Sequence, residues 1–351
     1  MTMTKTYTPR EFVDAIIEDF PDHAAGTRPV HVSGIGVEGF FRASDAAAAY
    51  CTAEHFQGED VDVIVRFSNG SGSPTRRDEV NDVRGMATRF LLKEHAPCDL
   101  IAMTLGEFFA PNPDEFMAFT KAATPVAPQR ESAWNKFKDM LRLELPLPDP
   151  YAGQQYDSGP GTLAFANAHA YARQAVVDSA GLGAPSSYAR AAYHGCNTFI
   201  AIAPDGHRRY VRFSWQPVAG VRKNADPSKG PAYLNAELKR RIERWPPRFV
   251  LNMTIGEDGD ALHDPSIPWP RRRRKISMGM LYLTKIAEDQ DKFAKNIAFN
   301  PGRLTPGLER DPEDEILNLR WRAYEVSREM RSGTACPFAK GDTPPEREDA
   351  S

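Results

Sequence analysis

The sequence predicts an α+β fold, an antiparallel β-barrel or sandwich with helices on its outside. The predicted strands come in runs that are separated by groups of helices, an order that fits this class. A doubly wound parallel sheet is disfavoured because its strands would alternate regularly with helices. The segment Pro204-Asp205-Gly206 lies between two apolar runs and is typical of the tight turn that joins antiparallel neighbours.

Length and composition indicate an ordinary globular protein. The chain has 351 residues, enough for one large core, and 41% of them are hydrophobic and 26% charged. The formal net charge of -3 gives no bulk attraction to nucleic acid or anionic membrane. No apolar run approaches the ~20 residues that span a bilayer. We therefore expect neither nucleic acid nor membrane as a partner.

Two further features concern the cellular compartment. The opening residues lack an apolar signal segment, so we expect a cytoplasmic protein. The 4 cysteines are scattered without paired spacing, which argues against a disulfide framework and against a zinc site.

A basic run at 271–275 could suggest nucleic acid, but a solvated loop or a subunit contact is the favoured interpretation.

The first predicted helix begins at Thr8, which suits an N-cap, with Pro9 in the first turn. Phe12, Ile16 and Phe20 then recur every four residues, as on one face of a short amphipathic helix. We expect this helix to end near Phe20 and to bury its apolar face.

The clearest strand covers residues 61–68. Val61, Val63 and Val65 alternate with other residues, as expected where one face of a strand is buried. Alternate side chains of a strand point to opposite faces, so Arg66 lies on the face opposite the valines.

The remaining elements are predicted from similar patterns. Further strands are expected in the second half of 81–92 and at 98–109, 197–202, 208–215, 247–255 and 276–284. Further helices are expected at 114–123, 131–143, 161–180 and 233–244, with a last helix starting near Pro312. The glycines within 27–36 imply a loop or a strand that another segment approaches closely. We divide the chain into an N-terminal helical segment (1–24), one core (25–332) and a polar tail (333–351) that we expect to be disordered.

One turn of the last helix carries a chemical signal. Arg320 and Tyr324 are four residues apart and so share one face of a helix. A guanidinium keeps its charge and stabilises a neighbouring phenolate, which is a hard anionic ligand for ferric iron. Tyrosine serves as the proximal haem ligand in catalase. The pair alone is weak evidence, so the other face of a haem pocket must come from elsewhere in the chain.

Six segments in order supply that context, and together they resemble haem catalases, in particular the small catalase-related peroxidases. The segments are Arg28-Pro29-Val30-His31, Arg66-Phe67-Ser68, 81–85, 99–109, 297–301 with Pro306-Gly307, and 320–324. The resemblance covers residues 25 to 330 and implies the catalase barrel, haem b as cofactor and peroxide chemistry.

The resemblance also implies roles for individual residues. Tyr324 is expected as the axial iron ligand, with Arg320 holding it as phenolate. His31 is expected as the distal acid–base group, which takes a proton from the peroxide and returns it to the leaving oxygen. Ser68 is expected to orient His31 through a hydrogen bond. Arg28, Arg66 and Arg328 are expected at the haem propionates, and Val32, Phe108 and Phe116 as walls of the haem and its channel.

The distal side departs from the family pattern at one position. Met103 stands where the family has an asparagine, and methionine is a weak acceptor and no donor. Thr104 is adjacent and could partly substitute for the amide if the register differs. Without an amide to position a second peroxide, the sequence predicts peroxidase activity with weak catalase activity. In the barrel hairpin Asn197 replaces the family's usual histidine, so binding of a protective dinucleotide is not carried over.

The sequence therefore predicts a haem peroxidase. It is expected to reduce hydrogen peroxide or organic hydroperoxides with small organic electron donors. One alternative is an allene oxide synthase-like enzyme that rearranges fatty-acid hydroperoxides, since such relatives also depend on changes in the distal pocket. The other is a haem sensor or carrier without turnover. The long N-terminal arm of large catalases is missing, which leaves a homodimer rather than an interlocked tetramer as the expected assembly.

Overall fold

The computed structural model describes residues 7–20, 22–123, 132–144, 161–224 and 230–332. The tail that we expected to be disordered, 333–351, lies outside the described residues. No helix in the described part of the chain is long and apolar enough to cross a membrane.

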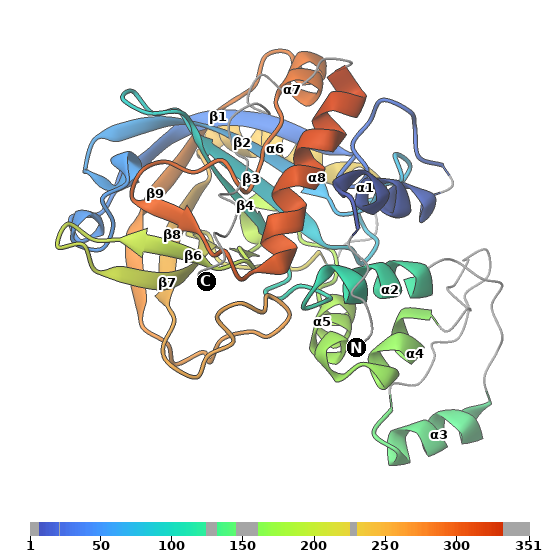
Figure 1. Cartoon of the computed structure of the whole chain (residues 1–351). Coiled ribbons are helices and arrows are strands. Elements are labelled where there is room, and N and C mark those ends of the chain that lie inside the picture. Colours follow the sequence, from blue (N-terminus) through green and yellow to red (C-terminus); the bar gives the residue numbers. More distant parts are fainter. Residues whose placement is uncertain (1–6, 21, 124–131, 145–160, 225–229, 333–351) are drawn as a thin grey trace.

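Eight antiparallel strands close a barrel (Figure 1). In order around it, these are β7 (Arg208–Pro217), β5 (Tyr193–His194), β4 (Cys98–Met103), β3 (Arg84–Phe90), β2 (Asp60–Asn69), β1 (Gly34–Ala43), β9 (Lys275–Ile286) and β8 (Arg248–Ile255). The barrel closes because β8 also pairs with β7. Two short strands, β6 (Phe199–Ile202) and β10 (Leu308–Arg310), extend the sheet beyond β7. This architecture confirms the predicted fold class.

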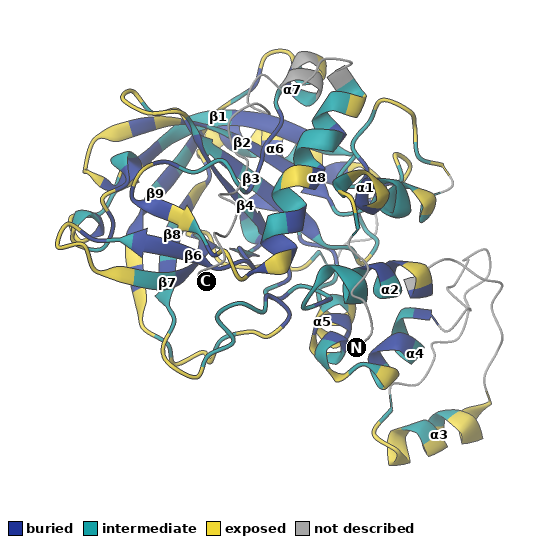
Figure 2. Ribbon diagram, viewed as in Figure 1, coloured by how far each residue is buried: buried dark blue, intermediate teal, exposed yellow. Residues whose placement is uncertain are grey.

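The barrel interior is the main hydrophobic core. Val61, Val63, Val65 and Phe67 of β2 are all buried in it, as their alternation predicts. Figure 2 shows the strands largely buried along their length. The residues between these positions face the outside of the barrel, where Asp62 is exposed, Ile64 is half-buried and Arg66 is buried.

The helices lie outside the barrel. They are α1 (Pro9–Glu18), α2 (Pro113–Ala123), α3 (Ala133–Leu141), α4 (Gly161–Ala168), α5 (Ala170–Gly181), α6 (Tyr233–Arg244), α7 (Gln290–Asn296) and α8 (Glu315–Ser332). The long helix α8 crosses the outer face of the barrel beside α1 (Figure 1). Because α1 packs against both α8 and α2, it belongs to the same structural unit as the barrel. The domain boundaries at residues 24 and 332 stay predictions.

Local signals placed several elements correctly. Thr8 caps α1, and its side chain and that of Glu11 form a reciprocal capping box. The hairpin turn between β6 and β7 has Gly206 at a φ of 80°, a conformation that favours glycine. In β1, a Cβ on Gly36 would lie 2.6 Å from the ring of Phe293, which confirms the close approach predicted there.

Three predicted boundaries were wrong. The strand expected at 98–109 ends at Met103. The backbone N–H of Thr104 still bonds to the carbonyl of Arg84, but the N–H of Arg84 bonds to the Thr104 side chain, and the chain then leaves the barrel. The helix expected at 161–180 is broken at His169, which has the extended backbone of an N-cap. The last helix begins at Glu315 rather than near Pro312.

Candidate active site

The candidate site lies on the outer face of the barrel, between the sheet and helices α1 and α8. Residues in register across neighbouring strands point to the same face of a sheet. One row of paired residues crosses four neighbouring strands. Ser68 of β2 pairs with Gly85 of β3, Gly85 pairs with Met103 of β4, and Met103 pairs with His194 of β5. All of them line one cavity, and Tyr324 of α8 lines it too.

His31 reaches this row from the loop before β1. Its Nδ1 lies 3.0 Å from Oγ of Ser68. His31 has a φ of 59°, in the left-handed region that costs energy for any residue except glycine. A Cβ on Gly85 would come within 2.9 Å of the imidazole and 2.8 Å of the Ser68 hydroxyl. Glycine in the row and strain in the loop together let the imidazole pack flat against the sheet.

The imidazole of His31 is neutral at physiological pH. Burial, followed by the positive charge of Arg66, lowers the pKa of His31 to about 4. When Nδ1 donates to Ser68, the lone pair on Nε2 is available as a base.

Arg320 and Tyr324 of α8 face the opposite side of the cavity. Nη2 of Arg320 donates to the Tyr324 hydroxyl at 3.4 Å, and Nη1 donates to Oδ1 of Asn197 at 2.6 Å. The sulfur of Cys196 lies 3.5 Å from the same Nη1. Burial by itself lowers the pKa of Arg320, but Tyr324, Cys196 and Asp314 outweigh it and raise the pKa.

A buried polar relay continues from Arg320. Nδ2 of Asn197 donates to Asp314 at 2.8 Å, and the other oxygen of Asp314 accepts from the backbone N–H of Leu317 at 2.8 Å. Asp314 therefore caps the helix that carries Arg320 and Tyr324 and also anchors their hydrogen-bond partner. Asn197 thus links Arg320 to Asp314 through an amide that does not titrate.

Three arginines gather at the rim of the cavity without a carboxylate partner. Arg28 donates to the carbonyl of Ile297 at 2.7 Å, and Arg66 donates to that of Val32 at 3.0 Å. Burial lowers the pKa of Arg28, Arg66 and Arg331, and repulsion by neighbouring arginines lowers these pKa values further. No described carboxylate raises them. Guanidinium groups stay charged, so this rim is suited to bind anionic groups.

The structure brings most of the predicted residues together. Arg28, His31, Arg66, Ser68, Met103, Arg320 and Tyr324 all line the cavity. Met103 lies beside the His31–Ser68 pair, as the alignment of the motifs predicts.

Thr104 lies elsewhere, which corrects the prediction that it could replace the missing amide. Its hydroxyl accepts from the backbone N–H of Arg84 at 2.9 Å, and it lines a second cavity. Neighbouring residues at the end of a strand point to opposite faces, so Met103 and Thr104 cannot both face His31.

Three predicted wall residues, Phe108, Phe116 and Val32, are not among the residues that line the cavity. The Arg320 guanidinium lies over the Phe108 ring at 5.5 Å, and Phe108 stacks on Phe116 at 5.3 Å. The backbone of Val32 donates to the carbonyl of Ser71 and accepts from the Arg66 guanidinium.

The third rim arginine is Arg331 rather than the predicted Arg328. On a helix, Arg331 is displaced by about 20° from Tyr324 around the axis and Arg328 by about 40°. The helical wheel could therefore have chosen Arg331. The wall formed by Phe12, Val13 and Ile16 of α1 was also missed, because no local pattern tells which face of the barrel a helix will cover.

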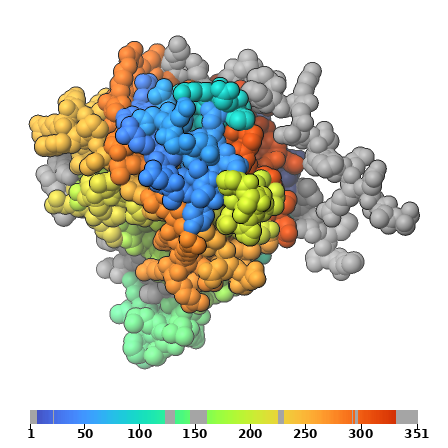
Figure 3. Space-filling model, turned by 90° about the vertical axis from the view of Figure 1, so that its left-hand side faces the viewer, coloured from blue at the N-terminus to red at the C-terminus, as the bar shows by residue number. Residues whose placement is uncertain are grey.

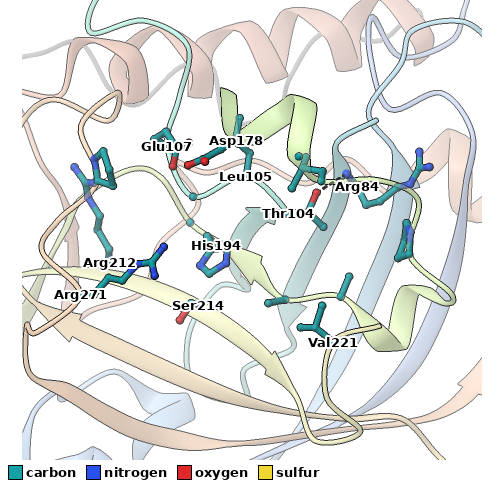
Figure 4. A pocket seen from close by; sticks show the side chains of 18 of the residues that line it. Arg84, Thr104, Leu105, Glu107, Asp178, His194, Arg212, Ser214, Val221 and Arg271 are labelled. Atoms are coloured by element: carbon teal, nitrogen blue, oxygen red, sulfur yellow. Dashed lines mark hydrogen bonds between the residues drawn. The ribbon is translucent and has the colours of Figure 1, made fainter. Parts of the chain in front are cut away.

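A second cavity of about 970 Å³ adjoins the first, and His194 lines both. Figure 4 shows His194 near its centre and the carboxyls of Glu107 and Asp178 facing each other at its edge. Burial and Asp178 raise the pKa of Glu107 to about 7. Part of the 271–275 basic run is engaged by the chain itself, since Arg273 pairs with Asp260 at 2.8 Å.

Comparison with known proteins agrees with this geometry. A profile of the family described as Catalase matches residues 12–145 and 163–338. The chain belongs to the catalase family. Its similarity to a catalase-related peroxidase of Mycolicibacterium paratuberculosis is 30% identity over 336 residues, which covers 94% of this chain and 97% of the relative. A catalase-related peroxidase of Synechococcus elongatus is 25% identical and covers 93% of this chain and 89% of the relative.

Solved catalases share the fold. A bacterial catalase superposes with a TM-score of 0.70 at 21% identity, over 88% of this chain and 58% of the other. A fungal catalase gives 0.70 at 20% identity, over 88% of this chain and 60% of the other. The protein therefore spans only part of these catalases but nearly the whole of both peroxidase relatives. It is an oxidoreductase of the catalase and peroxidase type.

Proposed function

We propose that this member of the catalase family is a cytoplasmic haem b peroxidase. It reduces hydrogen peroxide or organic hydroperoxides with small organic donors and has weak catalase activity. The observation that carries the proposal is the pairing of a Tyr324–Arg320 face with a neutral His31–Ser68 face across one cavity. A homodimer remains our expectation for the assembly.

The residues around the cavity fit a haem. Tyr324 offers a phenol oxygen, Arg320 supplies the positive charge that favours the phenolate, and Arg28, Arg66 and Arg331 suit two propionates. The space between these residues measures about 140 Å³, below the roughly 300–1,000 Å³ of pockets for small molecules and cofactors. We therefore expect residues around the cavity to move apart when haem binds.

A haem held by these residues would supply the redox chemistry that the two-electron reduction of a peroxide needs. The chain supplies the proton chemistry. Nε2 of His31 takes the proton from the attacking peroxide oxygen and returns it to the leaving oxygen. Ser68 fixes the ring for both transfers. With two electrons and two protons from the donor, one peroxide gives one alcohol or water molecule and one further water.

The same distal side favours one alternative. Met103 places a thioether beside His31 where an amide donor is missing, which also suits an allene oxide synthase-like rearrangement of a fatty-acid hydroperoxide. That reaction is a dehydration, in which the hydroperoxide gives an allene oxide and one water molecule, and it consumes no donor. Product analysis with a fatty-acid hydroperoxide separates the two functions, because only the peroxidase oxidises the donor.

A titration of haem into the haem-free full-length chain tests the proposal. We expect a one-to-one complex with a Soret band and peroxide-dependent oxidation of a phenolic donor. The double variant Arg28→Glu/Arg331→Glu should weaken haem binding, because it replaces the cations at the rim by anions. Arg272→Glu, an exposed position outside the cavity, serves as the control and should bind as the wild type does. Absence of a Soret band in the wild type would rule out the proposal.

A further inference from the structure

The helix α3 (Ala133–Leu141) carries an apolar face that the molecule leaves exposed. Trp134 is 63% exposed, Phe137 48%, Met140 63% and Leu141 69%. Figure 2 shows α3 as exposed, and Figure 3 shows its segment standing out from the body at the lower edge. The amphipathic helix α1 is the contrast, since its Phe12 is only 4% exposed. Exposure on this scale is unusual for one face of a helix in a globular protein.

The arrangement of charges around this face is regular. A helix turns by about 100° per residue, so Lys136 and Lys138 lie on either side of Phe137 and border the apolar sector. Lys138 extends over the Trp134 ring, with its Nζ 5.6 Å from the centroid, and Trp134 stacks on Phe137 at 5.7 Å. Arg142 follows at the end of the helix and is exposed. Such a helix, with aromatic residues on one face and bordering cations, is suited to lie in the interface of an anionic bilayer.

The end of α3 gives a second, independent indication. The backbone N–H of Glu144 bonds to the carbonyl of Asp139 and that of Leu143 to Met140, the pattern that usually has glycine in the left-handed position. Here that position is Leu143, with a φ of 58° and 81% exposure. A leucine at this position is strained, and its side chain is largely exposed. A contact outside the molecule would account for it.

We propose that α3 docks this protein on anionic lipid membranes, with its apolar face inserted at the level of the headgroups. A protein partner fits less well, because stable interfaces bury about 800 Å² on each side and lysine is depleted in them. Our expectation of no membrane partner rested on net charge and on the length of apolar runs, and neither tests a local face of one helix. The proposal is independent of haem binding and of the reaction.

Flotation of the full-length protein with lipid vesicles tests this proposal. One set of vesicles is phosphatidylcholine alone, and the other contains one third phosphatidylglycerol. We expect binding to the second set, and the double variant Trp134→Asp/Phe137→Asp should lower the partition coefficient about tenfold or more. Trp245→Asp is the matched control, since Trp245 is 74% exposed at the end of α6 and should not affect binding.

Two further variants separate insertion from a structural role. Lys136→Glu/Lys138→Glu should remove the preference for anionic vesicles. Leu143→Gly should lower the partition coefficient while thermal stability stays equal or rises, because glycine relieves the strained backbone. Failure of the wild type to bind either vesicle would overturn the proposal. The proposal would also be overturned if the Trp134/Phe137 variant bound vesicles as strongly as the wild type does. A wild-type oligomer that forms without lipid and is lost in this variant would overturn it as well.

Discussion

The two halves of the candidate site are built differently. On the proximal half, Arg320 bonds to Tyr324 and Asn197, and Asn197 continues to the buried Asp314. On the distal half, His31 bonds to Ser68, and Met103 lies beside them with His194 next in the row. The proximal half is held by several independent contacts, whereas the distal half keeps a proton carrier but no amide. Under the proposed function, this difference predicts family-like iron ligation but a different handling of a second peroxide.

The largest effect is expected on the proximal half. Tyr324→Phe removes the oxygen ligand and leaves Arg320 with a partner fewer, so the ferric absorption spectrum should change. Turnover of peroxide should fall by more than about a hundredfold, beyond the 10–100-fold range of groups that only orient a ligand. Tyr282→Phe, a tyrosine that stacks on Phe40 elsewhere on the barrel, should match the wild type in both measurements. An unchanged spectrum in Tyr324→Phe would remove this residue as the ligand.

On the distal half, His31→Gln removes the base but keeps a polar side chain. The rate constant for reaction with hydrogen peroxide should fall about 10²–10⁴-fold, the usual contribution of a positioned acid–base group. The ferric spectrum should keep its tyrosinate character, because the proximal contacts are untouched. Stopped-flow absorbance measures both, and a rate within twofold of the wild type would contradict the assigned role.

Met103→Asn tests the difference between the halves by introducing the amide that the distal half lacks. An amide at this position can donate to a second peroxide, so the oxygen evolved per peroxide consumed should rise severalfold. Met103→Leu is the matched control, because it keeps an apolar side chain of similar size and should evolve no more oxygen than the wild type. An oxygen electrode measures the yield, and equal yields from both variants would contradict the role given to the missing amide.

The smallest effect concerns acid stability. His31 has a pKa of about 4 in the folded chain and 6.5 when unperturbed, so the unfolded chain binds more protons between these pH values. The free energy of unfolding should therefore fall by about 3 kcal/mol as pH drops from 6.5 to 4, and only this part should be absent in His31→Gln. Urea unfolding at several pH values measures it. Parallel pH profiles for the two proteins would show that His31 contributes nothing.

Much of this site could be predicted from the sequence, because its motifs resemble those of a known family and local periodicity places some of their side chains. The spacing of Arg320 and Tyr324 placed both on one helical face, and the alternation along β2 placed Arg66 opposite the valines. The role of His31 came from resemblance, since nothing in its neighbours foretells the left-handed turn that aims it at Ser68.

What could not be predicted depends on register and packing. Thr104 lies one residue from Met103, and only the pairing of β4 with β3 decides which of them faces the cavity. The apolar wall from α1 was missed although Phe12 was recognised as buried, because the face that a helix covers is set by tertiary contacts. The position of Arg331 at the rim follows from helical geometry and could have been predicted from the sequence.

The fate of hydrogen peroxide tests the central claim most directly. The haem-loaded wild type is mixed with hydrogen peroxide and a phenolic donor, and oxygen and oxidised donor are measured together. We predict that most of the peroxide consumed appears as oxidised donor, with little oxygen. Release of one oxygen molecule for every two peroxides, at a rate independent of the donor, would contradict this account.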